Sequence, residues 1–355
     1  SYTTKGDFIS DFCSYYIKFN TIGSINTANG VSALRYNTTG NNNAANGYEA
    51  LYSNTTGSAN TVNGFQALYS NTEGNNNVAN GYASLYSNTT GTFNTANGVS
   101  TLYSNTTGNY NVANGYQALQ NNTTGYDNTA NGVAALYHNT TGVDNTATGF
   151  QALVNNTTGS YNTANGMSAL LYNTTGINNS ANGTSALHWN TTGSGNTATG
   201  NYALYSNSTG SGNIAIGGVN STGDYAPVFD ISTQNNHISM GSSSVTNAYI
   251  KVAWTTTSDK RDKTEFAEVP HGLDFVSKLK PTAYRYKESR DATEGHGSLR
   301  YGFLAQDVLE LEGSSSVIVD SSDEDKLRFN ESSLIAVLVK AVQELREEVE
   351  ILKGK

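Results

Sequence analysis

Side chains that could carry out chemistry are sparse in this 355-residue chain and are unevenly placed. Residues 1–257 hold 4 basic and 8 acidic side chains, whereas residues 258–355 hold 15 and 20. Glycosidases need paired carboxylates, and the repeats offer only isolated acids: Glu49, Glu73, Asp127 and Asp144. Metal sites need clustered ligands, and the five histidines lack such spacing, so we expect neither a metal nor a cofactor. The functional question therefore shifts to the ends of the chain, above all to S-D-K-R-D-K from residue 258.

Charge and composition exclude several classes of protein. The net charge of −9 argues against a nucleic-acid partner, which requires a basic stripe. Cys13 is the single cysteine, so no intrachain disulfide can form. The sequence shows no charged-then-apolar leader and no apolar run of about 18 residues, so we expect no signal peptide and no membrane insertion.

A strict repeat occupies more than half of the chain and must position everything else. Glycine recurs every 17 residues without insertion or deletion, at positions 30, 47, 64, 81, 98, 115, 132, 149, 166, 183, 200 and 217. A short fixed period of this kind indicates that each repeat is one turn of a stacked structure. The sequence therefore predicts a mostly β fold, a parallel β-roll or β-solenoid over residues 23–217.

Within the repeat, two asparagine columns and one leucine column keep the same spacing. Asn lies four residues before each glycine, from Asn26 to Asn213, and a second column runs from Asn37 to Asn207. Leu lies four residues after the glycine in eleven repeats, from Leu34 to Leu204. Stacking at about 4.8 Å turns the Asn columns into amide ladders and the Leu and Ala columns into an apolar spine. Repeated N-T-T also fits a glycosylation acceptor, but the ladder explains the period better.

The segment after each glycine, such as 99–103, favours β-structure and is predicted to be a second strand with two apolar faces. One thin coil can bury only one of these faces, so we expect an oligomer rather than a monomer. The flanking Tyr residues and Trp189 could stack on sugars, although packing between chains is the favoured role.

The repeat pattern resembles the β-roll head of trimeric autotransporter adhesins, whose coils stack around a threefold axis. Residues 1–22 are predicted to form a cap or attachment segment, because Phe8, Phe12, Tyr15, Tyr16 and Phe19 recur at helical spacing. Residues 218–257 are predicted to form a β-structured neck, with short strands at 225–231, 237–240 and 248–254.

The charged end of the chain combines three motifs in order: S-D-K-R-D-K from 258, L-K-P-T-A-Y-R-Y at 279–286 and Y-G-F-L-A-Q-D-V at 301–308. With the terminal helix, they resemble the self-cleaving intramolecular chaperone domain of phage tail spikes and fibres, shared with endosialidases. The resemblance covers residues 258–355. It implies a Ser–Lys dyad in which Ser258 is the nucleophile, Lys263 the general base and Thr257–Ser258 the bond that is cut once. A lysine acts as a base only when burial or nearby cations favour its neutral form, and Lys260 and Arg261 are close in sequence.

Residues 331–353 are predicted to form a coiled-coil helix. Its a positions are Ile335, Val342 and Val349, and its d positions are Leu338, Leu345 and Leu352. β-Branched a residues with Leu at d favour dimers, whereas the resemblance implies trimers. We follow the trimer because the β-roll also calls for threefold packing.

Together these features predict a homotrimeric phage tail fibre or spike segment that adheres to a host surface. It is expected to be assembled in the host cytoplasm and carried on the virion. Its partners are an upstream tail or fibre protein and a host-cell surface glycan or protein receptor. Identical coils slip easily in register, so a carboxyl-terminal domain that trimerises first and then cuts itself off would align them. The alternatives are a bacterial trimeric surface adhesin with the same chaperone and, more remotely, an ice-binding solenoid.

Overall fold

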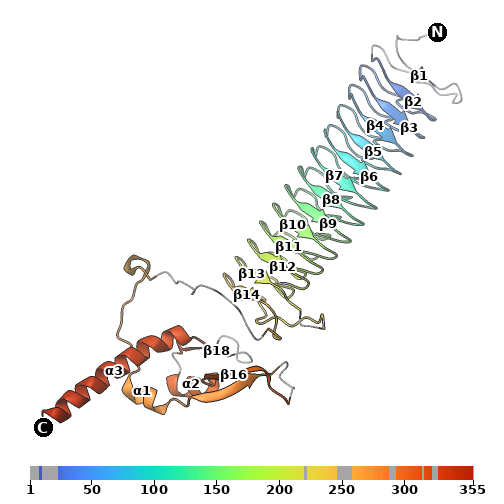
Figure 1. Ribbon diagram of the computed structural model, residues 1–355. Helices are drawn as coiled ribbons and strands as arrows, with labels where there is room; N and C mark the ends of the chain where they lie inside the picture. Colours follow the sequence, from blue (N-terminus) through green and yellow to red (C-terminus); the bar gives the residue numbers. More distant parts are fainter. Residues whose placement is uncertain are drawn as a thin grey trace. The chain divides into compact units, whose positions relative to one another are not determined.

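The polypeptide divides into two structural units, Ser1–Ser242 and Ser243–Lys355. The computed structural model describes residues 8–9, 23–219, 222–245, 258–287, 293–313, 316–321 and 327–354. The first unit is a stack of coils, and the second combines short antiparallel sheets with helices (Figure 1). The predicted mostly β fold with a carboxyl-terminal helix is therefore confirmed.

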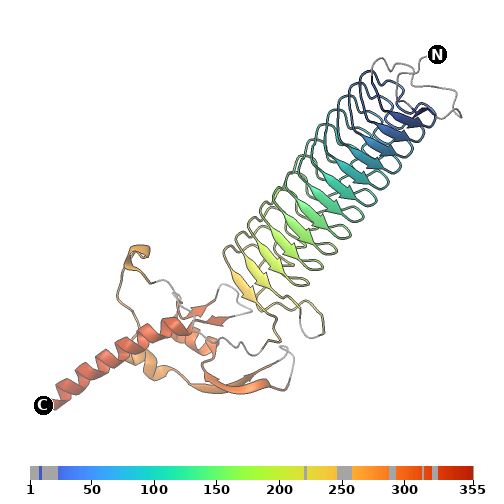
Figure 2. The same cartoon turned by 45° about the horizontal axis from the view of Figure 1, so that its top comes forward.

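One three-residue strand per coil builds the sheet of the first unit. Successive strands are parallel and in register, and sheet order follows chain order (Figure 2). The parallel β-solenoid of 17-residue repeats is thus confirmed. Its regularly spaced strands are β2 (Thr27–Asn29), β3 (Ala44–Asn46), β4 (Thr61–Asn63), β5 (Val78–Asn80), β6 (Thr95–Asn97), β7 (Val112–Asn114), β8 (Thr129–Asn131), β9 (Thr146–Thr148), β10 (Thr163–Asn165), β11 (Ser180–Asn182), β12 (Thr197–Thr199) and β13 (Ile214–Ile216).

The sheet continues beyond the regular repeat at both ends. β14 (Ile238–Met240) pairs with β13 across an enlarged coil, in which hydrogen-bonded residues lie 24 apart. The strand expected at 237–240 therefore belongs to the solenoid sheet, and the strand expected at 248–254 lies outside the described residues. β1 (Phe8–Ile9) pairs with β2, so a helical conformation is wrong for these two residues. The rest of the predicted cap, 1–22, lies outside the described part of the chain.

Asparagine amides form the predicted ladders inside the solenoid. Asn54 Nδ2 donates to Asn37 Oδ1 at 2.8 Å and to the Gly57 carbonyl at 2.8 Å. In the other column, Asn43 Nδ2 donates to the Gly57 carbonyl at 2.9 Å and to Asn26 Oδ1 at 3.2 Å. Both columns are almost completely buried, as are the Leu column and the Ala columns beside it. The ladder amides thereby find hydrogen-bond partners within the buried interior, as buried polar groups must.

The predicted second strand is wrong. Segment 99–103 is a turn in which Ser100 and Leu102 adopt positive φ values of 53° and 51°, and every regular coil repeats this alternation. Adjacent Ala50 and Leu51 consequently both point inward and are fully buried, rather than facing opposite sides. Left-handed backbone costs about 1 kcal/mol or more per non-glycine residue. Hydrogen bonds between coils offset this cost; Leu51 N, for example, donates to the Ala67 carbonyl at 3.0 Å.

The 17-residue glycine column is required by both conformation and space. Gly64 has a φ of +146°, which side chains rarely adopt, and a Cβ there would lie 2.3 Å from the carbonyl oxygen of Gly81. At this glycine column, consecutive coils thus lie too close together to leave room for a side chain. The fixed glycine spacing reflects this contact.

The second unit packs small elements around α3 (Glu331–Lys353). Its core includes Phe275, Val308, Ile318, Leu334 and Val337. Buried Glu312 accepts hydrogen bonds from the backbone N–H groups of Val317, Ile318 and Val319. The remaining elements are η1 (Lys260–Asp262), α1 (Leu273–Lys278), β15 (Thr282–Tyr286), β16 (His296–Gly302), α2 (Ala305–Glu312), β17 (Val319–Asp320) and β18 (Arg328–Phe329).

Candidate active site

A short 3-10 turn brings Ser258 and Lys263 together. η1 reverses the chain between them, and the Lys263 backbone N–H closes the turn on the Lys260 carbonyl. Lys263 Nζ then donates a hydrogen bond to Ser258 Oγ at 2.7 Å. This is the nucleophile–base separation needed for proton transfer from a serine hydroxyl. Thr257, the other residue of the predicted scissile bond, lies outside the described residues.

Asp259 and Arg261 hold this turn in shape. Asp259 Oδ1 accepts the backbone N–H of Arg261 at 2.9 Å, and its carboxylate also receives the Arg261 Nε and Nη2 groups. These bonds from Arg261 hold the pKa of Asp259 below its usual value. The pair therefore stays ionised near neutral pH and fixes the spacing between the residues that flank it.

The dyad is open to solvent in the single chain. Ser258 and Lys263 are both exposed, as are Lys260 and Arg261. A serine nucleophile in a Ser–Lys dyad requires a neutral amine, which burial or neighbouring cations favour. A single chain therefore places Ser258 and Lys263 at the distance that proton transfer needs, but it does not bury them.

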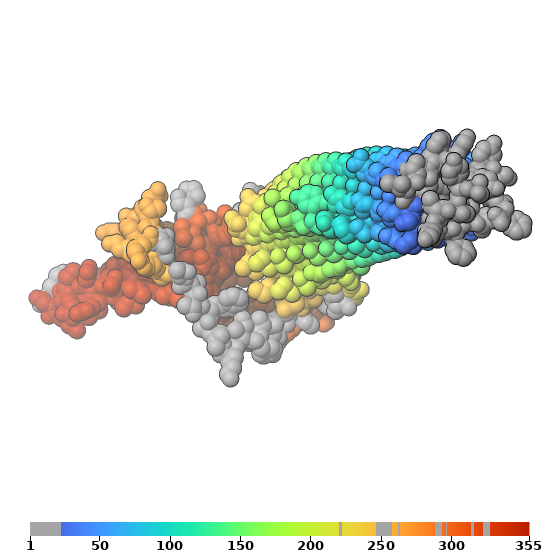
Figure 3. All heavy atoms as spheres, turned by 90° about the horizontal axis from the view of Figure 1, so that it is seen from above, coloured from blue at the N-terminus to red at the C-terminus, as the bar shows by residue number. Residues whose placement is uncertain are grey.

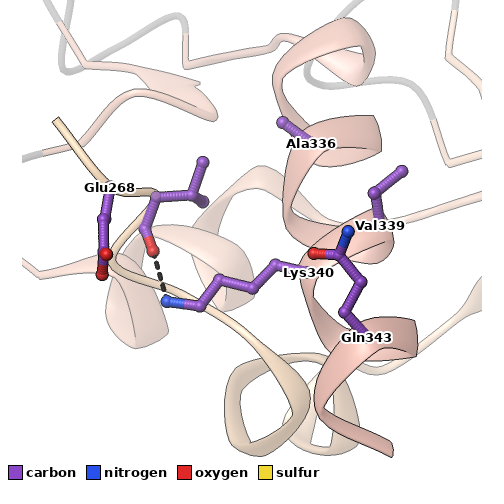
Figure 4. Close-up of a pocket in the computed structure, with 6 residues that line it drawn as sticks. Glu268, Ala336, Val339, Lys340 and Gln343 are labelled. Carbon is purple, nitrogen blue, oxygen red and sulfur yellow. Dashed lines mark hydrogen bonds between the residues drawn. The ribbon is translucent and has the colours of Figure 1, made fainter. Parts of the chain in front are cut away.

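Helix α3 anchors the segment that leads from the dyad to α1. Lys340 Nζ reaches the Val269 carbonyl at 2.7 Å (Figure 4). One turn later, Glu344 Oε2 accepts the Leu273 backbone N–H at 2.6 Å. A cavity of about 520 Å³ separates Glu268 from the α3 residues Ala336, Val339 and Gln343. Sequence reasoning missed this anchoring, because bonds over 71 residues leave no local signal.

The opposite side of α3 remains uncovered. Leu334, Val337 and Ala341 are buried within the unit. The predicted heptad seam is instead 38–69% exposed at all six positions, namely Ile335, Leu338, Val342, Leu345, Val349 and Leu352. The helix therefore carries two apolar faces, of which its own domain uses one.

An apolar stripe also runs along the solenoid. It occupies coil position 1, the residue directly after the coil glycine. Nine consecutive coils place a large apolar side chain there, each 40–54% exposed: Val31, Tyr48, Phe65, Tyr82, Val99, Tyr116, Val133, Phe150 and Met167. Side chains of successive coils form continuous rows along the solenoid surface (Figure 3). At about 4.8 Å per coil, the stripe is about 40 Å long.

Comparison with known families identifies one segment of the second unit. Residues 258–314 match the family described as chaperone of endosialidase, a peptidase family, so the matched segment begins at Ser258 and supports a chaperone domain in this part of the chain. The match ends before α3, whereas the sequence resemblance was expected to extend to residue 355. No curated protein matches the chain.

This domain and the β-solenoid together fit a tail-spike protein with a carboxyl-terminal chaperone domain. Among the described residues, no helix is both long enough and apolar enough to cross a membrane.

Proposed function

We propose that this chain is a segment of a homotrimeric phage tail fibre or spike that adheres to a host surface. Its carboxyl-terminal domain nucleates trimerisation and then releases itself by cutting Thr257–Ser258. The observation that carries the proposal is the 2.7 Å contact between Lys263 Nζ and Ser258 Oγ at the first residue of the family match. An upstream tail protein and a surface receptor are the partners that this role requires.

Assembly is supported by the two uncovered apolar surfaces. The α3 seam and the position-1 stripe lie in different units, yet both expose large side chains over their whole length. Exposed patches of this size are typical of interaction surfaces. In-register packing of identical chains is the arrangement that uses both, because each surface repeats at a fixed interval along its own element.

The cutting step follows from the positions of the two side chains. Neutral Lys263 takes the proton of Ser258 Oγ, and Oγ attacks the carbonyl carbon of Thr257. The carbon–nitrogen bond breaks, and the Ser258 nitrogen leaves as an amine with the proton that Lys263 returns. Water then hydrolyses the ester between Thr257 and Oγ, which leaves a carboxylate and the original hydroxyl. One peptide bond is cut per chain, so the reaction is a single turnover.

The solvent exposure of the dyad suggests when cutting happens. The Lys263 amine must lose its proton to act as a base, and an exposed amine has no burial to favour that loss. Packing of sister chains on the second unit supplies the missing desolvation. Cutting therefore follows assembly, and the aligned solenoid persists afterwards through a high unfolding barrier.

Electrophoresis of the expressed chain tests the dyad. The wild-type 37.6 kDa chain is expected to give two fragments, residues 1–257 and 258–355, whereas Ser258→Ala and Lys263→Met remain full length. Ser298→Ala and Lys280→Met are matched controls, because both residues are exposed and lie outside the dyad and its turn. Cutting that persists in Ser258→Ala would refute the assignment.

The chaperone role has a separate test. The chain that lacks residues 258–355 is expected to yield far less soluble trimer than Ser258→Ala, which keeps the domain attached. Equal yields of detergent-resistant trimer would show that the solenoid aligns without help.

A further inference from the structure

One surface column of the solenoid changes its character over five successive coils. At coil position 6, counted from the coil glycine, four consecutive coils carry serine: Ser53, Ser70, Ser87 and Ser104. The next five carry larger groups, Asn121, His138, Asn155, Tyr172 and Trp189, and the column then returns to Ser206. The fold itself does not require these residues, because serine occupies the same position in other coils of the same length.

These residues border an open groove of about 750 Å³. Its opposite side is a regular row of threonines at position 8, Thr140, Thr157, Thr174 and Thr191. The groove spans the coils from Asn121 to Trp189 and follows the solenoid axis. Its size falls within the range of small-molecule binding sites.

Two aromatic rings form a platform at one end of the groove. Tyr172 and Trp189 stack with ring centroids 4.4 Å apart and planes within 3° of parallel, and they are 37% and 44% exposed. Each ring turns one face to the other, so its second face points along the column toward Asn155 or Ser206. Both of these neighbours lack a ring that could cover it. The Asn155 side chain is held in place, because its Nδ2 donates to the Leu171 carbonyl of the next coil at 3.0 Å.

The remaining lining offers amides, threonine hydroxyls and the imidazole of His138. Asn121 Nδ2 lies 3.3 Å from His138 Nδ1, and threonine hydroxyls line the far side. No Lys, Arg, Asp or Glu side chain borders the groove, and Arg35 is the only Lys or Arg in the sequence between residues 23 and 219. An acidic ligand would thus find no guanidinium or ammonium group with which to pair.

We propose that this groove binds a neutral oligosaccharide. Aromatic faces pack against the C–H faces of sugar rings, while amides and hydroxyls exchange hydrogen bonds with sugar hydroxyls. The inference rests on the proposed adhesion function and specifies its ligand class. Packing between copies of the chain is a different role, because the stripe at position 1 serves every coil from Val31 to Met167, whereas the groove is confined to five coils.

Tryptophan fluorescence of the full chain tests the groove. Trp189 and Trp254 are the two tryptophans, so Trp254→Phe leaves Trp189 as the sole reporter. Neutral glucan, galactan and mannan hexasaccharides serve as probes, with sialyl and glucuronyl oligosaccharides as acidic counterparts. At least one neutral probe is expected to change the emission, whereas the acidic probes leave it unchanged. Binding of acidic probes alone, or of none, would overturn the proposal.

Two serine variants test the platform by calorimetry. Tyr172→Ser and Trp189→Ser restore the residue found in other coils, so they preserve the fold and are expected to raise the Kd at least tenfold. Tyr36→Ser, at the same position outside the groove, is the matched control and keeps wild-type affinity. Unchanged affinity in both variants contradicts the platform, and a changed oligomeric state would assign the groove to a sister chain instead.

Attachment to a panel of bacterial cells separates the two proposals. If wild type attaches and the groove variants attach equally well, the groove assignment fails while adhesion stands. If wild type binds a neutral probe but attaches to no cell, the groove stands and the adhesion function fails.

Discussion

Replacing one buried ladder asparagine by its isosteric acid separates hydrogen bonding from packing. Asn71 is fully buried, and its Nδ2 donates to Asn54 Oδ1 at 2.8 Å and to the Gly74 carbonyl at 3.0 Å. Its Oδ1 accepts Asn88 Nδ2 at 2.8 Å. Asn71→Asp keeps the shape and this acceptor, but at neutral pH it faces two acceptors with no donor.

The expected cost follows from these contacts. The Gly74 carbonyl keeps its bond from Asn60 Nδ2 at 2.9 Å, whereas Asn54 Oδ1 is left unsatisfied at a cost of about 1–3 kcal/mol. The new buried carboxylate also faces both oxygens without a donor, so the free energy of unfolding is expected to fall by about 3 kcal/mol or more. Burial also raises the pKa of the new carboxyl group above its unfolded value. Stability is therefore greatest below the unfolded pKa and is lost as the pH rises through the folded pKa.

Denaturant unfolding followed by circular dichroism, at pH 4 and pH 7.5, measures both effects. Asn63→Asp is the matched control in the same coil, because its ladder with Asn46 and Asn80 is exposed to solvent. The control is expected to lose less than about 1 kcal/mol, with little dependence on pH. Equal losses in the two variants, or no recovery of Asn71→Asp at pH 4, would refute the view that buried amide ladders hold the coils together.

Three further changes probe other parts of the chain. Gly64→Ala forces a side chain onto a φ of +146° and against the next coil, so the backbone alone costs about 2 kcal/mol and thermal unfolding should begin at a lower temperature; an unchanged melting curve contradicts the close approach. Leu345→Asp on the α3 seam is expected to give single chains in analytical ultracentrifugation. Ile351→Asp, at an exposed residue outside the seam, is expected still to assemble. Assembly of both variants would argue against a role of the seam in assembly. Burial and the 2.5 Å bond to Asp230 raise the pKa of Tyr225, so the stabilisation that Tyr225 provides is complete below about pH 10 and declines above that pH. Tyr225→Phe should lack this decline when unfolding is measured at alkaline pH. The same decline in wild type and variant would contradict the prediction.

The solenoid was predictable because its interior repeats the same residues. A column such as Asn37 to Asn207 can form a ladder only if consecutive repeats lie directly above one another. Period, direction of stacking and buried spine all follow from that requirement. The hydrogen bonds and burial of these columns agree with it in detail.

The turn after each glycine was mispredicted for a physical reason. Val99, Thr101 and Tyr103 favour extended backbone, and a local reading predicts a strand. The left-handed conformation of Leu102 is instead sustained by its N–H bond to the Ala118 carbonyl of the next coil. The residues near Leu102 in the sequence give no sign of this partner, which belongs to the next coil. The left-handed conformation that it supports turns two adjacent side chains inward.

The candidate sites differ in the same way. Ser258 and Lys263 are five residues apart, so a short turn suffices to join them, and the family motif points to the pair. The groove beside Trp189 leaves a signal only when the coils are aligned and the serine column is seen to break. The bond from Lys340 to the Val269 carbonyl involves a main-chain acceptor, so no side-chain pairing announces it.

The enlarged coil between β13 and β14 has a consequence for how such a shaft can vary. Its extra residues form a loop, while Ile214 and Ile238 still pair in register. The stack of coils therefore accommodates an insertion and keeps its strands aligned. In-frame duplication of one 17-residue unit would lengthen the shaft by one step and leave both ends intact. The length of the solenoid can therefore vary through the number of repeats, while its binding surface varies independently through inserted loops.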